Sequence, residues 1–239
     1  MTDSSVQETE MRPSISFKDA LRQATFAPGR VLKGDVKEIE LGIFGNEARS
    51  LSEETAKDPA RREFGKIVYV TADGRVLLQN KPTAGDEESI THSLKIAHKG
   101  SSLLPRHLRQ DRFIGTLLHS HPVDSMPSIP DLSLILLGDD ELEAETAVFV
   151  TTPKRNMVVF RGDNTRHLST EEVDRILKDS ETVLKEGIAG YIQSQAPSTE
   201  ELVRFHTLAE AEANKTLINT FDLKFFEGAL NDSRVVLQV

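Results

Sequence analysis

Four apolar segments ahead of residue 165 have the hydrophobic pattern of β-strands. Residues 66–80, KIVYVTADGRVLLQN, contain two β-rich runs joined by an Asp-Gly pair, which favours a tight turn and predicts a β-hairpin. Residues 112–121, RFIGTLLHSH, are apolar on both faces, as expected for a buried strand. Residues 36–45 predict another strand, and residues 146–162 predict a strand pair.

Helix starts are indicated by serines that precede a run of helical periodicity. A serine at the N-cap accepts a hydrogen bond from the first turn, and an acidic residue three positions later reinforces the cap. The apolar residues between Val173 and Tyr191 recur at helical spacing, and a further charged helix is expected after residue 45, ending at Pro59. The expected N-caps are Ser16, Ser128, Ser169 and Ser198. A short strand, RVVLQV, is expected to close the chain.

These elements divide the chain into three parts. Residues 1–12 are polar and are expected to form a disordered tail, and residues 13–168 are expected to form an α/β domain. Residues 169–239 are expected to form an accessory helical region outside the active site. The apolar face between residues 173 and 191 is expected to pack against the core, with dimerisation as the alternative; the oligomeric state stays open.

Composition narrows the class of protein. The 239 residues are 38% hydrophobic, carry a formal net charge of −9 and include no cysteine. The negative charge argues against nucleic acid or an anionic membrane as a partner. Without cysteine, a disulfide framework and a thiolate nucleophile are excluded, and a metal site must use histidine and carboxylate ligands. The polar N-terminus lacks a secretory signal pattern, so we expect a cytoplasmic protein.

The segment LLHSHPVDSMPSIPDL, residues 117–132, concentrates candidate metal ligands. On a strand, His119 and His121 point to the same face and can chelate one zinc ion. Asp131, in the first turn of the next helix, can supply a third ligand, which leaves a fourth position for water, as in catalytic zinc sites. The Ser128 hydroxyl would lie beside that position and could donate to a developing oxyanion.

The pieces HSHP and PSIPD resemble the H-S-H-P…S-x-x-D motif of the JAMM (JAB/MPN) zinc metalloprotease family, particularly its bacterial-type domains. The gap between the two pieces is one residue shorter than in the commonest form. The resemblance covers residues from about 36 to 165. It implies a JAMM/cytidine-deaminase-like α/β fold, in which a curved mixed β-sheet is flanked by helices. Here a C-terminal helical extension would follow.

The resemblance also implies a glutamate upstream of the histidines that acts as general base and then as general acid. Glu40, Glu47 and Glu63 are the candidates. We assign Glu63, because EFGKIVYVTADG resembles the glutamate-bearing strand of bacterial members, although its glycine follows after one residue instead of two. Glu40 remains the main rival, and a surface role for Glu63 is the other alternative.

The resemblance thus implies a zinc-dependent peptidase or isopeptidase that hydrolyses an amide bond. The segment after Asp131 leaves no room for the long insertion of ubiquitin-chain enzymes, so the expected substrate is the tail of a ubiquitin-like or sulfur-carrier protein, or a flexible peptide. The alternative is a non-catalytic protein-interaction module of the same fold. Asp124 is a weaker ligand candidate, and the remaining five histidines lack ligand spacing: His92, His98, His107, His167 and His206.

Overall fold

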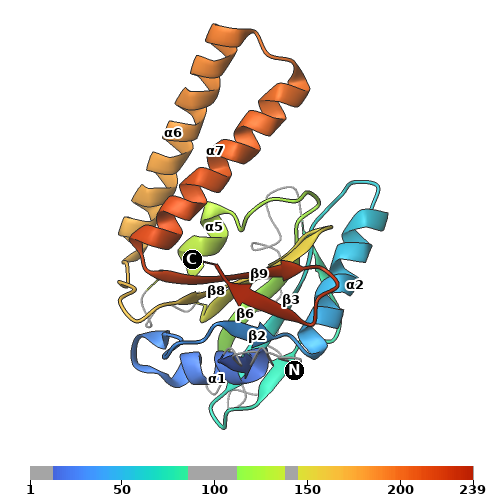
Figure 1. Cartoon of the computed structure of the whole chain (residues 1–239), viewed down its shortest axis with the longest axis vertical. Helices are drawn as coiled ribbons and strands as arrows, with labels where there is room; N and C mark the ends of the chain where they lie inside the picture. Colours follow the sequence, from blue (N-terminus) through green and yellow to red (C-terminus); the bar gives the residue numbers. More distant parts are fainter. Residues whose placement is uncertain (1–12, 86–111, 138–144, 239) are drawn as a thin grey trace, which may run out of the picture.

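One mixed β-sheet forms the centre of the molecule (Figure 1). The computed structural model describes residues 13–85, 112–137 and 145–238. Within these residues, ten strands join in the order β1-β2-β10-β9-β8-β7-β6-β3-β4, and β5 pairs with β3. The pairs β1–β2 and β6–β7 are parallel and the others are antiparallel. The strands are β1 (Ser14–Ser16), β2 (Glu38–Glu40), β3 (Phe64–Thr71), β4 (Val76–Leu78), β5 (Thr83–Ala84), β6 (Arg112–Ser120), β7 (Ala147–Thr151), β8 (Arg155–Arg161), β9 (Leu223–Ala229) and β10 (Arg234–Leu237).

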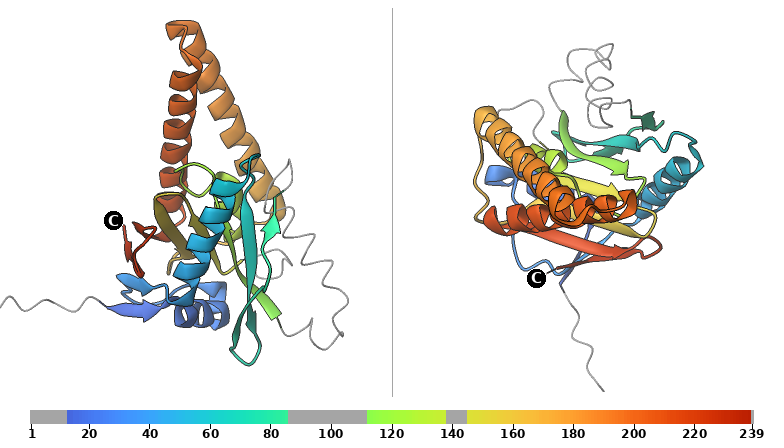
Figure 2. Two further views of the ribbon diagram at one scale, coloured as in Figure 1. Left: turned by 90° about the vertical axis from the view of Figure 1, so that its right-hand side faces the viewer. Right: turned by 90° about the horizontal axis from the view of Figure 1, so that it is seen from above.

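Helices cover both faces of this strongly curled sheet (Figure 2). The α-helices are α1 (Phe17–Phe26), α2 (Ile43–Lys57), α5 (Ile129–Leu134), α6 (Thr170–Gln195) and α7 (Thr199–Thr220). One core cluster packs α1 and α2 against one face, and a second packs α5 and the lower ends of α6 and α7 against the other. The expected α/β architecture, a curved mixed sheet flanked by helices, is therefore confirmed. None of the described helices combines the length and apolar composition needed to cross a membrane.

Local sequence signals explain where most elements begin. The hydroxyls of Ser16, Ser128, Ser169 and Ser198 each accept a bond from the backbone N–H three residues later, and the last three form full capping boxes. Gly74 has φ 78°, a conformation that favours glycine, and it closes the turn between β3 and β4. The predicted helix starts and the predicted hairpin are confirmed.

The strand expected over residues 36–45 is shorter than the apolar pattern suggests. Only Glu38–Glu40 is extended, because the chain turns at Gly42, where φ is 55°, and α2 begins at Ile43. The residues that follow Gly42 are apolar at helical rather than alternating spacing: Phe44, Ala48 and Leu51 are buried against the sheet. The sequence pattern therefore predicted a strand where helix α2 begins.

The division at residue 168 needs correction, because the C-terminal region is not only helical. β9 pairs with β8, and β10 bridges β9 and β2, so the last residues complete the same sheet. The pattern missed β9, since the reversal after α7 uses Asp222 at φ 52° and contains no glycine or proline. Only the outer part of the α6–α7 hairpin stands clear of the sheet (Figure 1). The expected tail, residues 1–12, lies outside the described residues.

This topology predicts two different outcomes for two truncations. A chain ending at residue 168 would lose β9 and β10 and leave β8 and β2 as unpaired edges, so we expect loss of cooperative folding. Replacing residues 183–208 by a four-residue Gly-Ser linker should leave the body intact, with a Tm within a few degrees of the full chain. Circular dichroism melts of both variants test this. A cooperative melt of the 1–168 chain would contradict the corrected division.

Candidate metal centre

His119 and His121 lie at the end of β6 on the face covered by α5. Strand alternation places both side chains on that face, and both residues are buried, at 2% and 7% exposure. Their Nε2 atoms are 3.2 Å apart. The His121 N–H donates to the Thr151 carbonyl on β7 at 2.8 Å, which extends the strand pairing past Ser120. The sheet therefore holds both imidazoles by their backbone.

Asp131 joins the histidines from the first turn of α5. Its carboxylate lies 3.3 Å from His119 Nε2 through Oδ1 and 3.5 Å from His121 Nε2 through Oδ2. The backbone N–H and hydroxyl of Ser128 donate to Oδ2 at 2.7 and 2.6 Å. The capping box thus orients a buried carboxylate toward the histidines, and the shorter gap between HSHP and PSIPD does not prevent it.

The separations of these three groups fit a tetrahedral metal ion. Zinc binds nitrogen and carboxylate oxygen at about 2.0–2.2 Å, so two ligands of one tetrahedral ion lie about 3.3–3.5 Å apart. The two histidine Nε2 atoms are 3.2 Å apart, and they lie 3.3 and 3.5 Å from Asp131, His119 from Oδ1 and His121 from Oδ2. With one ligand atom taken from each residue, the group whose atoms lie within 4.8 Å of one another is Glu63, His119 and His121. Two imidazoles and one carboxylate are also a common catalytic zinc donor set.

The outer nitrogens of both rings bond to neighbouring groups of the same loop or strand. His119 Nδ1 lies 3.1 Å from the Leu117 carbonyl, and His121 Nδ1 lies 2.8 Å from the Ser125 hydroxyl. A carbonyl can only accept, so the His119 proton sits on Nδ1 when the ring is neutral, and its Nε2 lone pair faces Asp131. Such support is typical of histidines that bind metals.

Glu63 is the carboxylate that the sheet brings beside the histidines. It directly precedes β3, in which Gly65 is paired with His119. Its Oε1 lies 3.9 Å from His121 Nε2, and its side chain is 30% exposed. Glu63, His119 and His121 form a group whose ligand atoms lie within 4.8 Å of one another. Glu63 stands farther out than Asp131, on the side that reaches solvent.

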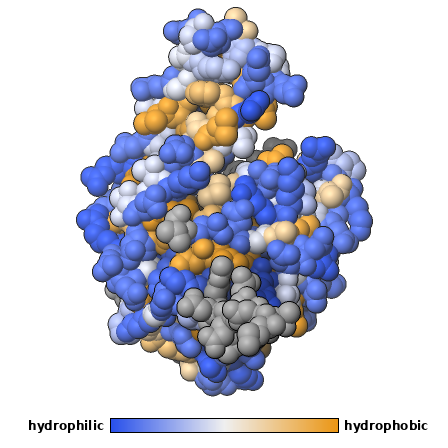
Figure 3. All heavy atoms as spheres, in the orientation of Figure 1, coloured by the Kyte–Doolittle hydropathy of each residue, from blue (hydrophilic) through white to orange (hydrophobic). Residues whose placement is uncertain are grey.

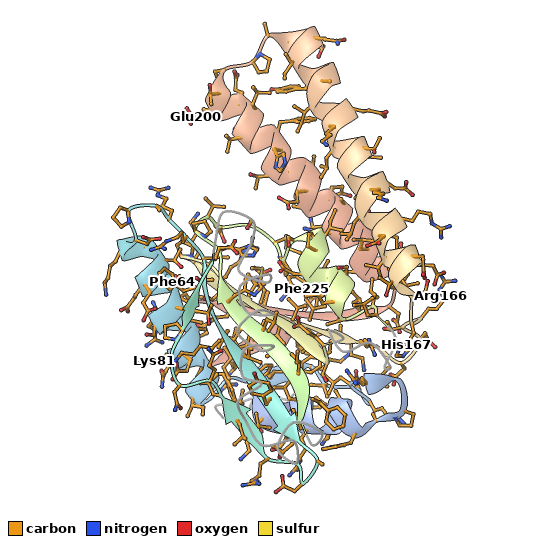
Figure 4. The ribbon with its side chains drawn as sticks, turned by 180° about the vertical axis from the view of Figure 1, so that it is seen from behind. Phe64, Lys81, Arg166, His167, Glu200 and Phe225 are labelled. Atoms are coloured by element: carbon orange, nitrogen blue, oxygen red, sulfur yellow. The ribbon has the colours of Figure 1, made fainter. Side chains whose placement is uncertain are left out.

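Ser120, between the two histidines, fixes the backbone next to Glu63 from the opposite face of the sheet. Its hydroxyl oxygen accepts the Phe64 N–H at 3.1 Å, lies 3.1 Å from the Phe64 carbonyl and contacts the Thr55 hydroxyl of α2. Figure 4 labels Phe64, the first residue of β3. Sequence reasoning treated Ser120 only as part of a motif, although strand alternation already placed it on the α2 side.

The rival carboxylates lie elsewhere. Glu47 is on α2, on the other face of the sheet, where it forms a 2.6 Å ion pair with Lys66. Glu40 is on β2, and β10, β9, β8 and β7 separate that strand from β6. Asp124 pairs with Arg155 at 2.8 Å and is used to hold the loop after His121. Of the three glutamates, only Glu63 reaches the histidines.

Ser128 lies in the site, but its hydroxyl is engaged with Asp131. The hydroxyl donates to the carboxylate and accepts the Asp131 N–H at 3.2 Å. It has one proton, so donation to an oxyanion would require it to turn away from Asp131. In this arrangement Ser128 positions the Asp131 carboxylate.

Asn214 connects the site loop to α7. It is completely buried, and its Nδ2 donates to the Pro127 carbonyl at 2.7 Å, one residue before the Ser128 cap. Helix α5 packs against both α6 and α7. No local pattern in the sequence could predict this contact, since 87 residues separate its two partners.

The buried side chains of the site stabilise one another by opposite charges, Asp131 negative and His119 positive. Burial lowers the pKa of His119, but the Asp131 carboxylate, helped by Glu63, outweighs it and raises the pKa to about 9. Burial raises the pKa of Asp131, whereas His119 and His121 hold it well below its usual range. The carboxylate is therefore ionised, and a proton on His119 balances it where a metal cation otherwise would.

Comparison of the chain with protein-family models, curated proteins and solved structures finds no match in any of the three. The assignment of the site therefore depends on its own geometry.

We predict one zinc ion per chain. Protein purified without chelator should contain close to one equivalent by elemental analysis, because two imidazoles and the carboxylates of Asp131 and Glu63 lie within a few ångströms of one another. His119→Ala and Asp131→Ala should each lose most of it, whereas His206→Ala, a half-exposed control on α7, should keep it. Wild-type protein that is folded but takes up no zinc would refute the site.

The metal-free protein should be most stable between about pH 4 and pH 6.5. Asp131, with a lowered pKa, stabilises the fold above its unfolded pKa of about 4. His119 stabilises it fully below its unfolded pKa of about 6.5, and this contribution is lost as the pH rises through the folded pKa of about 9. In the presence of chelator, the Tm should therefore fall mainly as the pH rises from about 6.5 to about 9. His119→Asn should flatten that fall and His206→Asn should not; a slope unchanged in His119→Asn would contradict the assignment.

Proposed function

We propose that this protein is a zinc-dependent peptidase or isopeptidase of the JAMM type. The observation that carries the proposal is the convergence of His119, His121 and Asp131 at ligand separations, with Glu63 3.9 Å from His121. These residues come from β6, α5 and the start of β3, three separate segments. The JAMM-like form of the α/β fold is part of the same proposal. It is supported by a histidine strand that runs into the aspartate helix within one curled mixed sheet.

The chain's own residues divide the chemistry between them. His119, His121 and Asp131 would hold the zinc ion, which supplies a Lewis acid and lowers the pKa of water to about 7. Glu63 accepts the proton of the attacking water and then passes it to the departing amine. Its partial exposure suits this role, since a base must reach both the water and the substrate. Ser128 and Ser125 hold Asp131 and His121 in place.

The substrate class follows from the resemblance and from the short connection after the site. Only residues 135–146 separate α5 from β7, which leaves no room for a long insertion that could grip a ubiquitin chain. We therefore propose a ubiquitin-like or sulfur-carrier protein, or a flexible peptide, as substrate. The non-catalytic module remains the second candidate. It would need no base, and the presence of Glu63 beside a full donor set favours the enzyme.

Substitution of Glu63, the proposed general base, tests the proposed activity. A cleavable substrate is first sought by incubating zinc-loaded protein with a proteome-derived peptide library and with ubiquitin-like fusion proteins. Mass spectrometry identifies the cleaved products. On that substrate, Glu63→Gln should lower kcat/KM roughly 10²–10⁴-fold, because the amide keeps the shape of the side chain but cannot accept the proton. Zinc content and Tm should stay near wild type.

Two matched variants serve as controls. Glu40→Gln and Glu47→Gln make the same change away from the histidines, so the rate should stay within a few-fold of wild type. If zinc-loaded wild type cleaves none of these substrates, the binding-module candidate gains. If Glu47→Gln or Glu40→Gln loses activity as Glu63→Gln should, the base is misassigned.

A further inference from the structure

Glu145, which directly precedes Thr146 and strand β7, is a buried acidic residue that the site described so far does not use. The visible face of the molecule in Figure 3 is largely hydrophilic, because most charged side chains lie at the surface. Of the acidic side chains that the structure describes, only Glu38, Asp131 and Glu145 are buried, at 8%, 4% and 2% exposure. Asp131 belongs to the site, and Glu38 pairs with Arg234 at 2.6 Å. Burying a carboxyl group costs free energy unless polar groups bond it, so the burial of Glu145 is explained by the bonds that it makes.

The side chain of Glu145 holds the strand that carries the two histidines. Its Oε2 accepts the Leu117 N–H of β6 at 2.9 Å. The pairing of β6 with β7 begins one residue later, at Leu118 and Phe149, so Glu145 extends the bonding of β6 beyond the paired residues. The Leu117 carbonyl in turn lies 3.1 Å from His119 Nδ1. The residue that orients the His119 ring is therefore itself fixed through its amide by Glu145.

The backbone of Glu145 holds the helix that carries Asp131. Its N–H donates to the carbonyl of Leu134, the last residue of α5, at 3.1 Å. The last carbonyls of a helix have no partner inside the helix, so this bond anchors the C-terminal end of α5. The Ser128 cap holds the other end. Both ends of the short helix that presents Asp131 are thus fixed, one of them by Glu145.

Glu145 also lies close to the candidate ligands in space. One small pocket is lined by Leu117, His119, Asp131, Leu134, Glu145 and Val148. The three lining side chains other than His119, Asp131 and Glu145 are aliphatic and cannot accept a hydrogen bond. If the Glu145 carboxyl group were withdrawn, this lining would offer the Leu117 N–H no aliphatic substitute, and the amide that supports His119 would lose its partner.

We propose that Glu145 is a positioning residue of the metal centre. Its two bonds join β6 to α5, so that His119 and Asp131 stand 3.3 Å apart before a metal binds. Groups that orient metal ligands from outside typically change metal affinity by about 10- to 100-fold. The inference deepens the proposed function and rests on its metal site. Glu145 acts through Leu117 and Leu134 and is not a catalytic residue.

Two variants of Glu145 separate the reach of the side chain from its charge. The zinc Kd of the metal-stripped full chain is measured by competition with a fluorescent chelator. Glu145→Asp keeps the carboxyl group but is about 1.5 Å shorter, so it cannot reach the Leu117 N–H while its backbone stays on Leu134. Its zinc Kd should rise by about 10- to 100-fold. Glu145→Gln keeps the length and an acceptor oxygen, so its zinc Kd should stay within about threefold of wild type.

Glu38→Asp is the matched control, because it makes the same change at the other buried glutamate. Glu38 pairs with Arg234 on β10, and β10, β9, β8 and β7 separate its strand from β6. Shortening its side chain should lower the Tm by circular dichroism and leave the zinc Kd near wild type. This control distinguishes a general loss of stability from a loss of ligand positioning.

The outcomes separate this inference from the proposed function. If Glu145→Asp melts cooperatively and binds zinc as tightly as wild type, the inference is overturned and the proposed function stands. If Glu145→Gln loses as much affinity as Glu145→Asp, charge rather than the hydrogen bond matters, and the positioning role is rejected. Wild type that takes up no zinc refutes the metal centre and this inference with it.

One further measurement needs no variant and decides the case in which Glu145→Asp fails to fold. In metal-free wild type, the Leu117 amide should exchange its hydrogen slowly by NMR, because its bond to Glu145 is formed before a metal binds. Exchange at the rate of an exposed amide would show that the bond is not formed in advance, and it would overturn the proposal.

Discussion

The antiparallel pairing of β3 with β6 is the constraint on which the site depends. It places Gly65 opposite His119, so the residue just before β3, Glu63, comes to the two histidines. Side-chain alternation along β6 then has a second effect. The histidines face α5, while Ser120 faces α2 and bonds the backbone of Phe64. A one-residue slip in this register would turn the imidazoles toward α2 and separate them from Asp131.

The cap of α5 and the candidate metal site share one carboxylate, that of Asp131. Asp131 accepts two bonds from Ser128 through Oδ2, which fixes its rotamer, and Oδ1 stays directed at His119. Two imidazole nitrogens only 3.2 Å apart repel each other unless a proton or a cation lies between them or beside them. The ionised Asp131 makes a cation favourable there. Local helix chemistry and metal chemistry therefore favour the same conformation.

The sequence predicted the features that local physics determines. Strand alternation is sufficient to place His119 and His121 on one face, and the Ser128–Asp131 cap follows from helix-start chemistry alone. The choice among Glu40, Glu47 and Glu63 was different, because it depended on which strand neighbours β6, and strand order is a property of the whole sheet. β9 was missed for a local reason, as its turn uses Asp222 in a left-handed conformation where glycine is expected. Asn214 could not be predicted at all, since its role is a single long-range contact.

The α6–α7 hairpin has a root, the part next to the sheet that includes Asn214, and an outer part, residues 183–208. At the root, Asn214 is buried, and its Oδ1 has no hydrogen-bond partner among the described residues, whereas its Nδ2 bonds the Pro127 carbonyl beside the turn that carries Asp131. Leaving a buried amide oxygen without a hydrogen-bond partner costs free energy. Just past the root, β9 returns the chain into the sheet between β8 and β10. The root is thus held on one side by the site loop and on the other by the sheet, and residues 183–208 extend from it without contributing to either core cluster. Changes in residues 183–208 should therefore leave the site undisturbed, whereas changes at Asn214 act directly on the turn that carries Asp131.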